Sequence, residues 1–199
     1  MKKYILLLLL ISGTILFVHA DAGDPVTLGI HAAFGGRYDD LRMCVGSPPG
    51  VKGGPIADIY LDIRIPAGPG SSLAVNLPVM RPILFAAAFR MLQAEPQVTW
   101  EYSLPGPGNL ETILGGGLGV SLHYGPDYTS SREEPGEAFF AAGPFISGSA
   151  GLVLPGTSGA WMPGIKVFYT PLFSADRPMG TVVGGVAELH YLWPGDTRP

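Results

Sequence analysis

Beyond its first twenty residues the chain contains three histidines, His31, His123 and His190, and each falls on the polar side of an alternating stretch. Glu188 lies two residues before His190, and Ser121 lies two residues before His123, so each pair would project from one face of an extended strand. An imidazole beside a carboxylate can bind a metal ion or act as a general base. A serine beside a histidine can act as a nucleophile.

These residues do not form a tight motif, so we interpret the histidines as satisfied interior groups and assign no catalytic, cofactor-binding or metal-ligating residue. The glycine-rich stretch GGGLG at 115–119 lacks the Lys-Ser/Thr pair and the following helix of a phosphate-binding loop. Acidic residues in the longer connections fit no calcium-loop spacing and are interpreted as solvated surface. They are Asp39, Asp40, Asp127, Glu133 and Glu134.

The first twenty residues, MKKYILLLLLISGTILFVHA, predict a secretory signal peptide. Lys2 and Lys3 form its positive start, an apolar run follows, and the chain turns polar at Asp21. An uncleaved anchor is the alternative, but the run is shorter than the roughly 20 residues that a spanning helix needs. We therefore expect cleavage near Ala20 and a single domain over 21–199.

Composition narrows the class of protein that follows the signal peptide. Loss of Lys2 and Lys3 leaves 10 basic and 16 acidic residues, a net charge of −6, which offers no basic footprint for nucleic acid. The single cysteine, Cys44, excludes a disulfide scaffold within one chain. The 29 glycines and 20 prolines suggest many turns, while 47% hydrophobic residues exclude a disordered chain. The balance indicates an all-β protein.

Eight segments alternate with a period of two, whereas a helical face would repeat about every three to four residues. They are residues 27–34, 56–65, 72–80 continued by 83–89, 97–104, 113–124, 138–154, 164–173 and 180–193. The stretch ILFAAAFRML at 83–92 could instead form one short helix; we assign 83–89 to the strand that begins at residue 72. Longer and shorter connections alternate between these segments, and the longest are 35–55 and 125–137.

Each segment has an apolar face and a polar face. The polar faces hold a set of ionisable side chains: His31, Asp58, Asp62, Arg64, Glu101, His123, Lys166, Glu188 and His190. If these faces meet water, the protein is an ordinary half-exposed antiparallel sheet. If they line a narrow lumen, the charges must pair with one another. Composition alone allows both.

Two patterns favour a lumen. The apolar faces carry aromatic residues near strand ends, where the two interfacial girdles of a membrane barrel lie: Phe34, Trp100, Tyr102, Tyr124, Tyr169 and Trp193. The polar face of 113–123 is mostly glycine and serine, which suits a narrow barrel filled by larger side chains opposite.

The last segment, GGVAELHYLW at 184–193, resembles the terminal strand of outer-membrane β-barrel proteins, although PGDTRP follows it. Together with the alternating connections, it makes the chain similar to the small eight-stranded barrels of the OmpA/OmpX type over most of 25–193. The resemblance implies an antiparallel up-and-down barrel in the outer membrane of a double-membraned bacterium, in contact with lipid. It also implies that the barrel assembly machinery reads the 184–193 strand.

The resemblance further implies a structural or interaction role, with loops 35–55 and 125–137 displayed to a ligand that the sequence does not identify. One alternative is a barrel that transports a small or hydrophobic solute. Another is a soluble periplasmic β-barrel or sandwich that binds a ligand. We expect no catalytic activity, because no further nucleophile signature accompanies Ser121 and His123.

Four prolines, Pro78, Pro82, Pro144 and Pro171, fall inside the proposed strands, where each removes a hydrogen-bond donor from the ladder. Arg81 falls in the phase of the apolar face beside Pro82. We expect bulges or strand ends at these positions.

Overall fold

The computed structural model describes residues 26–41, 51–89, 91–107, 110–127 and 136–193. The predicted signal peptide, Cys44, Glu133 and Glu134 lie outside these ranges. Within them, no helix has the length and hydropathy required to cross a bilayer.

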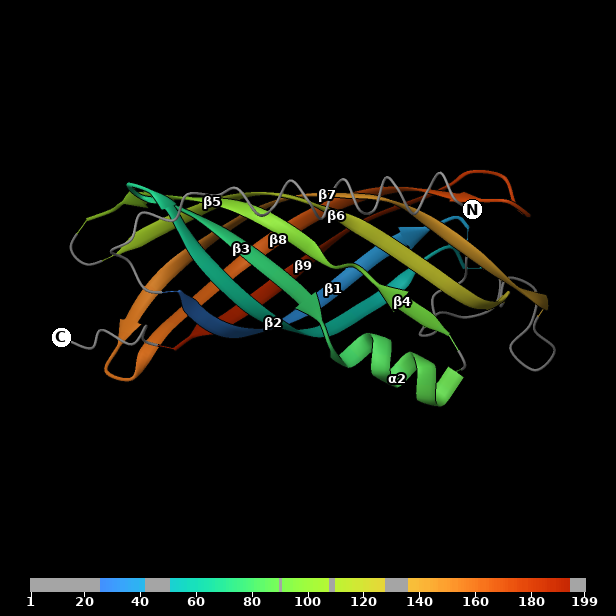
Figure 1. Cartoon of the computed structure of the whole chain (residues 1–199), viewed down its shortest axis with the longest axis horizontal. Helices are drawn as coiled ribbons and strands as arrows, with labels where there is room; N and C mark the ends of the chain where they lie inside the picture. Colours follow the sequence, from blue (N-terminus) through green and yellow to red (C-terminus); the bar gives the residue numbers. More distant parts are fainter. Residues whose placement is uncertain (1–25, 42–50, 90, 108–109, 128–135, 194–199) are drawn as a thin grey trace.

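The described residues form nine strands and one helix (Figure 1). The first strands are β1 (Thr27–Asp39), β2 (Gly54–Gly68) and β3 (Ser71–Pro78), followed by the helix α2 (Met80–Phe89). Then come β4 (Leu92–Ala94), β5 (Gln97–Pro105), β6 (Glu111–Asp127), β7 (Gly136–Gly156), β8 (Gly159–Ser174) and β9 (Gly180–Leu192).

All strand pairs are antiparallel, and β9 returns to pair with β1, which closes the sheet. The short strand β4 pairs with β6 beyond the end of β5, so β4 and β5 together occupy one place in the wall. The ring therefore has eight places, which confirms the predicted eight-stranded up-and-down barrel. Figure 1 shows the strands crossing the barrel axis at a steep tilt.

The strands reach further than the alternation predicted. The predicted long connection 35–55 is shorter at both ends, because β1 continues to Asp39 and β2 begins at Gly54. Likewise β6 continues to Asp127. Asp39 and Asp127 are buried, so the prediction that they are solvated loop residues is wrong.

The prediction of a strand over 83–89 is also wrong, because residues 80–89 form α2. Apolar residues occupy every position of ILFAAAF, so the alternation cannot distinguish the two faces of a strand. Alanine and leucine favour a helix, and Pro82 is the third helical residue, where a missing N–H has no intrahelical partner to lose. The apolar side chains Ile83 and Leu84 are exposed on the outer side of the helix.

Where the chain passes from β3 into α2, the hydrogen-bonded ladder between β2 and its neighbour ends. The β2–β3 ladder ends at Tyr60 opposite Pro78, with one further bond from the Val79 N–H to the Ile59 carbonyl. No described strand pairs with 54–59 on that side. The helix contacts β2 and β4, and in Figure 1 it lies beside the wall at this place.

The prolines occupy strand ends and breaks in the ladder. Pro78 ends β3, and Pro82 lies in α2. Pro144 in β7 and Pro171 in β8 both lie in an interruption of the β7–β8 register, which passes from the pair Ala142–Phe173 directly to Ile146–Tyr169. The N–H groups that these two prolines lack therefore fall in the same interruption, and the loss of hydrogen bonds between β7 and β8 is confined to that place.

The two faces of the wall have opposite polarity. Large apolar side chains point outward on every strand of the ring, with Phe34 and Leu118 each 68% exposed. Ionisable side chains point inward and are buried. The lumen also has an apolar part, built mostly from β7, β8 and β9, that includes Phe139, Phe145, Phe168, Leu172 and Val182.

Neighbouring glycines of β6 predict contrasting effects. A Cβ on inward-facing Gly117 would collide with the Ser147 hydroxyl, which donates to Gln97 over 2.9 Å, whereas a Cβ on Gly116 would meet nothing within 4 Å. We expect Gly117→Ala to cost about 1–3 kcal/mol through overpacking. We expect Gly116→Ala to be neutral or stabilising by up to about 1 kcal/mol. The temperature at which the folded barrel unfolds in detergent measures both; equal effects would contradict the packing argument.

Candidate functional site

The ionisable residues singled out from the sequence all lie buried in the lumen: His31, Asp58, Asp62, Arg64, Glu101, His123, Lys166, Glu188 and His190. Six of them belong to two larger clusters of buried polar residues, and Arg64, Glu101 and His123 lie beside these clusters. The seam cluster consists of His31, Asp62, Lys166, Glu188 and His190, where β1 meets β9. The helix-side cluster consists of Arg37, Asp58, Arg81, Gln93 and Glu95, beside α2.

The register of β1 and β9 builds the seam cluster. His31 lies directly opposite His190, and Glu188 lies opposite Ala33, on the same inward face as both histidines. Asp62 comes from β2, the neighbour of β1 on the other side, where it is opposite Gly29. Closure of the barrel thus brings together residues from opposite ends of the chain.

Asp62 holds both histidines by the same ring atom. Its carboxylate lies 2.8 Å from Nδ1 of His31 and 2.9 Å from Nδ1 of His190, and it accepts a 2.8 Å bond from the Asn76 amide. An ionised carboxylate only accepts hydrogen bonds, so both Nδ1 atoms act as donors. The Nε2 atoms are left to face elsewhere.

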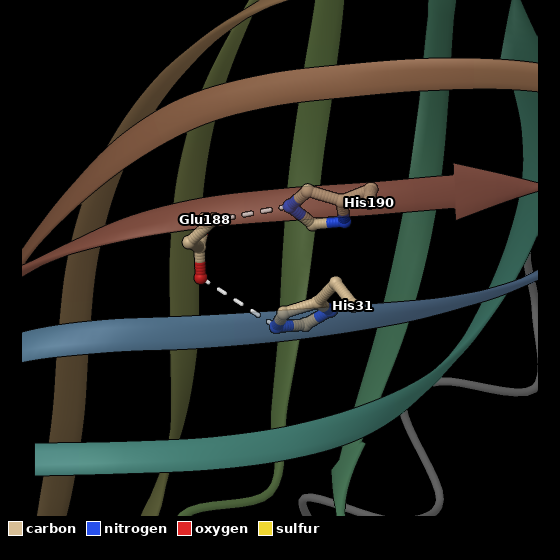
Figure 2. Close-up of side chains that lie close together, drawn as sticks. All are labelled: His31, Glu188 and His190. Carbon is tan, nitrogen blue, oxygen red and sulfur yellow. Dashed lines mark ion pairs between the residues drawn. The ribbon is translucent and has the colours of Figure 1, made fainter.

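Both Nε2 atoms face Glu188, as Figure 2 shows. Nε2 of His31 lies 3.5 Å from one carboxylate oxygen, and Nε2 of His190 lies 3.5 Å from the other. Lys166 Nζ lies 2.5 Å from the oxygen that faces His31. The His31 ring stacks on Tyr60 at 4.4 Å between centroids, with His190 4.2 Å away on its other side.

A bidentate ion pair lies next to the seam cluster. Arg64 donates to both oxygens of Glu101, over 2.8 and 3.0 Å, and the Ser72 hydroxyl donates to the same carboxylate. The two charges neutralise each other in this fork geometry. Nη2 of Arg64 also lies 3.4 Å from Nδ1 of His190, and its Nη1 has no hydrogen-bond partner among the described residues.

The helix-side cluster joins the two edges of the interrupted wall. Arg81, at the start of α2, forms an ion pair with Asp58 of β2 at 3.2 Å and another with Glu95, between β4 and β5. Asp58 also accepts the Arg81 backbone N–H over 2.8 Å. Strand alternation predicted Arg81 in the phase of the outward apolar face, but its side chain is buried inside.

Arg37 completes this cluster. It donates to Gln93 over 3.0 Å and pairs with Asp39 at 3.3 Å. Arg37 and Gln93 were not among the predicted lumen residues, because both fell in predicted connections. The alternation along β1 could have identified Arg37, because residues 31, 33, 35, 37 and 39 lie on one inward face.

Ser121 and His123 lie together as their spacing suggests. The Ser121 hydroxyl is 3.0 Å from Nε2 of His123, and Glu95 lies within 3.5 Å of both side chains. In a nucleophilic triad the carboxylate would orient the histidine through the nitrogen opposite to the serine. Here Glu95 shares the nitrogen that faces Ser121, and both side chains are almost fully buried. This arrangement is that of a structural polar network.

Side chains fill most of the lumen. One cavity of about 20 Å³ is lined by Glu188, His190, Lys166 and Met162, among others. A second, of about 10 Å³, is lined by Asp58, Glu95, Phe145 and Phe168, among others. Each has room for about one water molecule.

The six aromatic residues assigned to the interfaces all point outward. Phe34, Trp100, Tyr102, Tyr124, Tyr169 and Trp193 are between 44% and 68% exposed. Their outward position leaves them available to the surroundings of the barrel rather than to its interior.

Comparison with known proteins supports the fold. The structure is similar to the crystal structure of Neisserial surface protein A, with a TM-score of 0.55 and 9% sequence identity. The alignment covers 83% of this chain and 96% of the other. No family model and no curated protein matches the sequence. At this identity the likeness is one of fold: the two chains share a barrel architecture.

Proposed function

We propose that the chain is an outer-membrane β-barrel protein of structural and interaction type. The observation that carries this proposal is the polarity of the wall. Apolar side chains cover the outside and ionisable side chains are buried inside. A soluble barrel has the reverse arrangement, because burial of apolar surface drives its folding in water. A barrel with an apolar outside is stabilised by lipid around it.

The strand QVTWEYSL illustrates the point. Trp100 and Tyr102 are each 49% exposed, while Thr99 and Glu101 are buried in the lumen. In the alternative of a soluble periplasmic binding protein, the aromatic residues would form the core. The fold shared with a protein described as a surface protein supports the same placement.

The filled lumen favours a structural or interaction role over transport. Cavities of about 20 and 10 Å³ between buried ion pairs do not form a wide pore. One observation supports the transport alternative: the smaller cavity is lined both by Asp58 and Glu95 of the helix-side cluster and by Phe145 and Phe168 of the apolar part of the lumen. A small apolar solute could use that route only if α2 moved.

The proposed partners are membrane lipid, the assembly machinery and an unidentified ligand of loops 35–55 and 125–137. Residues 184–193 support the assembly role, since β9 is the last of the described strands and Trp193, which follows it, is exposed. We propose no catalytic role, consistent with the burial of Ser121 and His123.

Fractionation and electrophoresis test the membrane proposal. We expect the protein to stay with the membrane after carbonate washing and to migrate faster on a semi-native gel unboiled than boiled, because a closed hydrogen-bonded barrel resists detergent. Release into the periplasm by osmotic shock, without a shift on boiling, would support the soluble alternative instead.

Conductance separates the two membrane roles. We expect the purified barrel to produce no steady channels in planar bilayers. Steady open channels would overturn the structural role while leaving the barrel intact.

A further inference from the structure

We propose that His31, His190 and Glu188 form a binding site for a divalent transition-metal ion of the zinc class, at the seam where β1 and β9 close the barrel. The site depends on the closed barrel and not on the membrane around it. The hydrogen bonds and ion pairs between the lumen side chains do not themselves require an ion.

The chemistry of the donor set suits such an ion. Two imidazole nitrogens and a carboxylate oxygen are ligands that zinc accepts in proteins. The donor atoms of His31, Glu188 and His190 all lie within 4.8 Å of one another. In zinc sites the second nitrogen of a ligand histidine commonly donates to a carboxylate, which fixes the ring. Asp62 does this for both histidines at once, over 2.8 and 2.9 Å.

Glu188 lies between the two histidines without accepting a good hydrogen bond from either, and each Nε2 faces a different oxygen of its carboxylate. Both Nε2–carboxylate distances are 3.5 Å, longer than a good N–H···O bond. Ligand atoms at about 2.0–2.1 Å from a tetrahedral ion lie roughly 3.3 Å apart. Nε2 of His31 is fully buried and has no hydrogen-bond partner. The three donor atoms, within 4.8 Å of one another, would move closer together around an ion, which would satisfy this nitrogen.

The charge balance around the seam also favours a cation. Three carboxylates, those of Asp62, Glu101 and Glu188, lie near two cationic side chains, Arg64 and Lys166. Arg64 is paired with Glu101, and Lys166 with Glu188. Among the described residues Asp62 has no direct contact with a cationic side chain: its partners are the uncharged Asn76 and the two imidazoles, one of which lies 3.4 Å from Arg64. A buried carboxylate without a counter-charge is costly, and a bound ion next to both imidazoles supplies positive charge.

Lys166 is the competitor for this site, because its ammonium lies 2.5 Å from Glu188. Ion binding displaces it, and the cavity of about 20 Å³ beside Glu188 and His190 has room for a water molecule as a fourth ligand. Bound metal would then join the first and last strands of the ring. It would stabilise the folded barrel by mass action, because the unfolded chain does not hold the three donors together.

The experiment uses the folded barrel in detergent, treated with a chelator and then titrated with Zn²⁺. We expect one equivalent of Zn²⁺ per chain and a higher temperature for loss of the folded band on a semi-native gel. Co²⁺ in place of Zn²⁺ is expected to give the intense visible absorption of a tetrahedral site with nitrogen and oxygen ligands. His190→Gln should remove both effects.

His123→Gln is the matched control, since His123 is also a buried histidine and lies beside Glu95, a carboxylate of the helix-side cluster. It should bind Zn²⁺ as the unaltered protein does. Asp62→Asn should weaken binding by roughly 10–100-fold, the usual effect of removing a group that orients a ligand.

Lys166→Met tests the site by a gain rather than a loss. Without the competing ammonium, Zn²⁺ should bind more tightly, and this result does not depend on the folding of the histidine variants. Absence of Zn²⁺ binding by both the unaltered and the Lys166→Met barrels would overturn the proposal. Equal loss of binding in His123→Gln and His190→Gln would overturn it as well.

Discussion

Arg81→Met is expected to destabilise the folded barrel by about 3–5 kcal/mol, the usual cost of removing one partner from a buried ion pair. Arg81 is buried in the lumen and pairs with Asp58 and Glu95, which stand on the two edges of the interrupted wall. Its loss leaves two buried carboxylates without this counter-charge, and it releases the start of α2 from β2. We expect the folded band on a semi-native gel to disappear at a markedly lower temperature.

Arg177→Met is the control for this prediction. Arg177 pairs with Asp127 at 2.8 Å, but its side chain is 40% exposed, and exposed pairs contribute at most about 1 kcal/mol. The triple variant Arg81→Met, Asp58→Asn, Glu95→Gln should recover part of the lost stability, since no uncompensated charge remains. A barrel that keeps its full heat resistance after Arg81→Met would refute the role of Arg81 in closing the wall.

Leu118→Arg is expected to cost about 2–4 kcal/mol in a lipid bilayer, the range for a cation on the lipid face near the midplane. Leu118 lies near the middle of β6, beside Val98 and Ile146 on the neighbouring strands, and is 68% exposed on the outside. In water an exposed leucine tolerates this change almost without cost. The substitution therefore distinguishes lipid from water around the barrel. Equilibrium unfolding in bilayer vesicles measures it.

Met179→Arg is the matched control. Met179 is 63% exposed, close to the 68% of Leu118, but it lies in the connection between β8 and β9, at the end of the barrel. We expect little change in stability there, because an end connection can reach the aqueous phase. If Leu118→Arg is as harmless as Met179→Arg, the outside of the barrel does not face lipid.

Alternation in the sequence was sufficient to predict most of the wall. A period of two is a local property, and in 97–104 or 164–173 it sorts side chains into two faces without knowledge of the neighbours. The same parity, followed past residue 34, would have predicted Arg37 and Asp39 as inward residues. The boundaries were less certain because polar residues near a strand end have the composition of a loop.

The helix α2 was not determined by the local pattern. Apolar residues at every position of ILFAAAF are compatible with a buried strand or a helix. Tertiary contacts decided between them: the β2–β3 ladder ends at Pro78, and Asp58 accepts the Arg81 N–H at the start of the helix. The direction of the Arg81 side chain follows from that helix start and not from strand parity.

The sequence by itself determined that the strands have two faces and which residues share each face. Closure into an antiparallel ring was implied only by the resemblance to small outer-membrane barrels, and the pairing of β1 with β9 decided it. Only the tertiary structure decided that the polar face is the lumen and which charges pair across it. Side-chain alternation has the same period in a soluble and in a membrane barrel, so the period alone does not tell which face points into the barrel. The pairing of His31 with His190 depends on the register of the first and last strands, and closure of the ring alone sets that register.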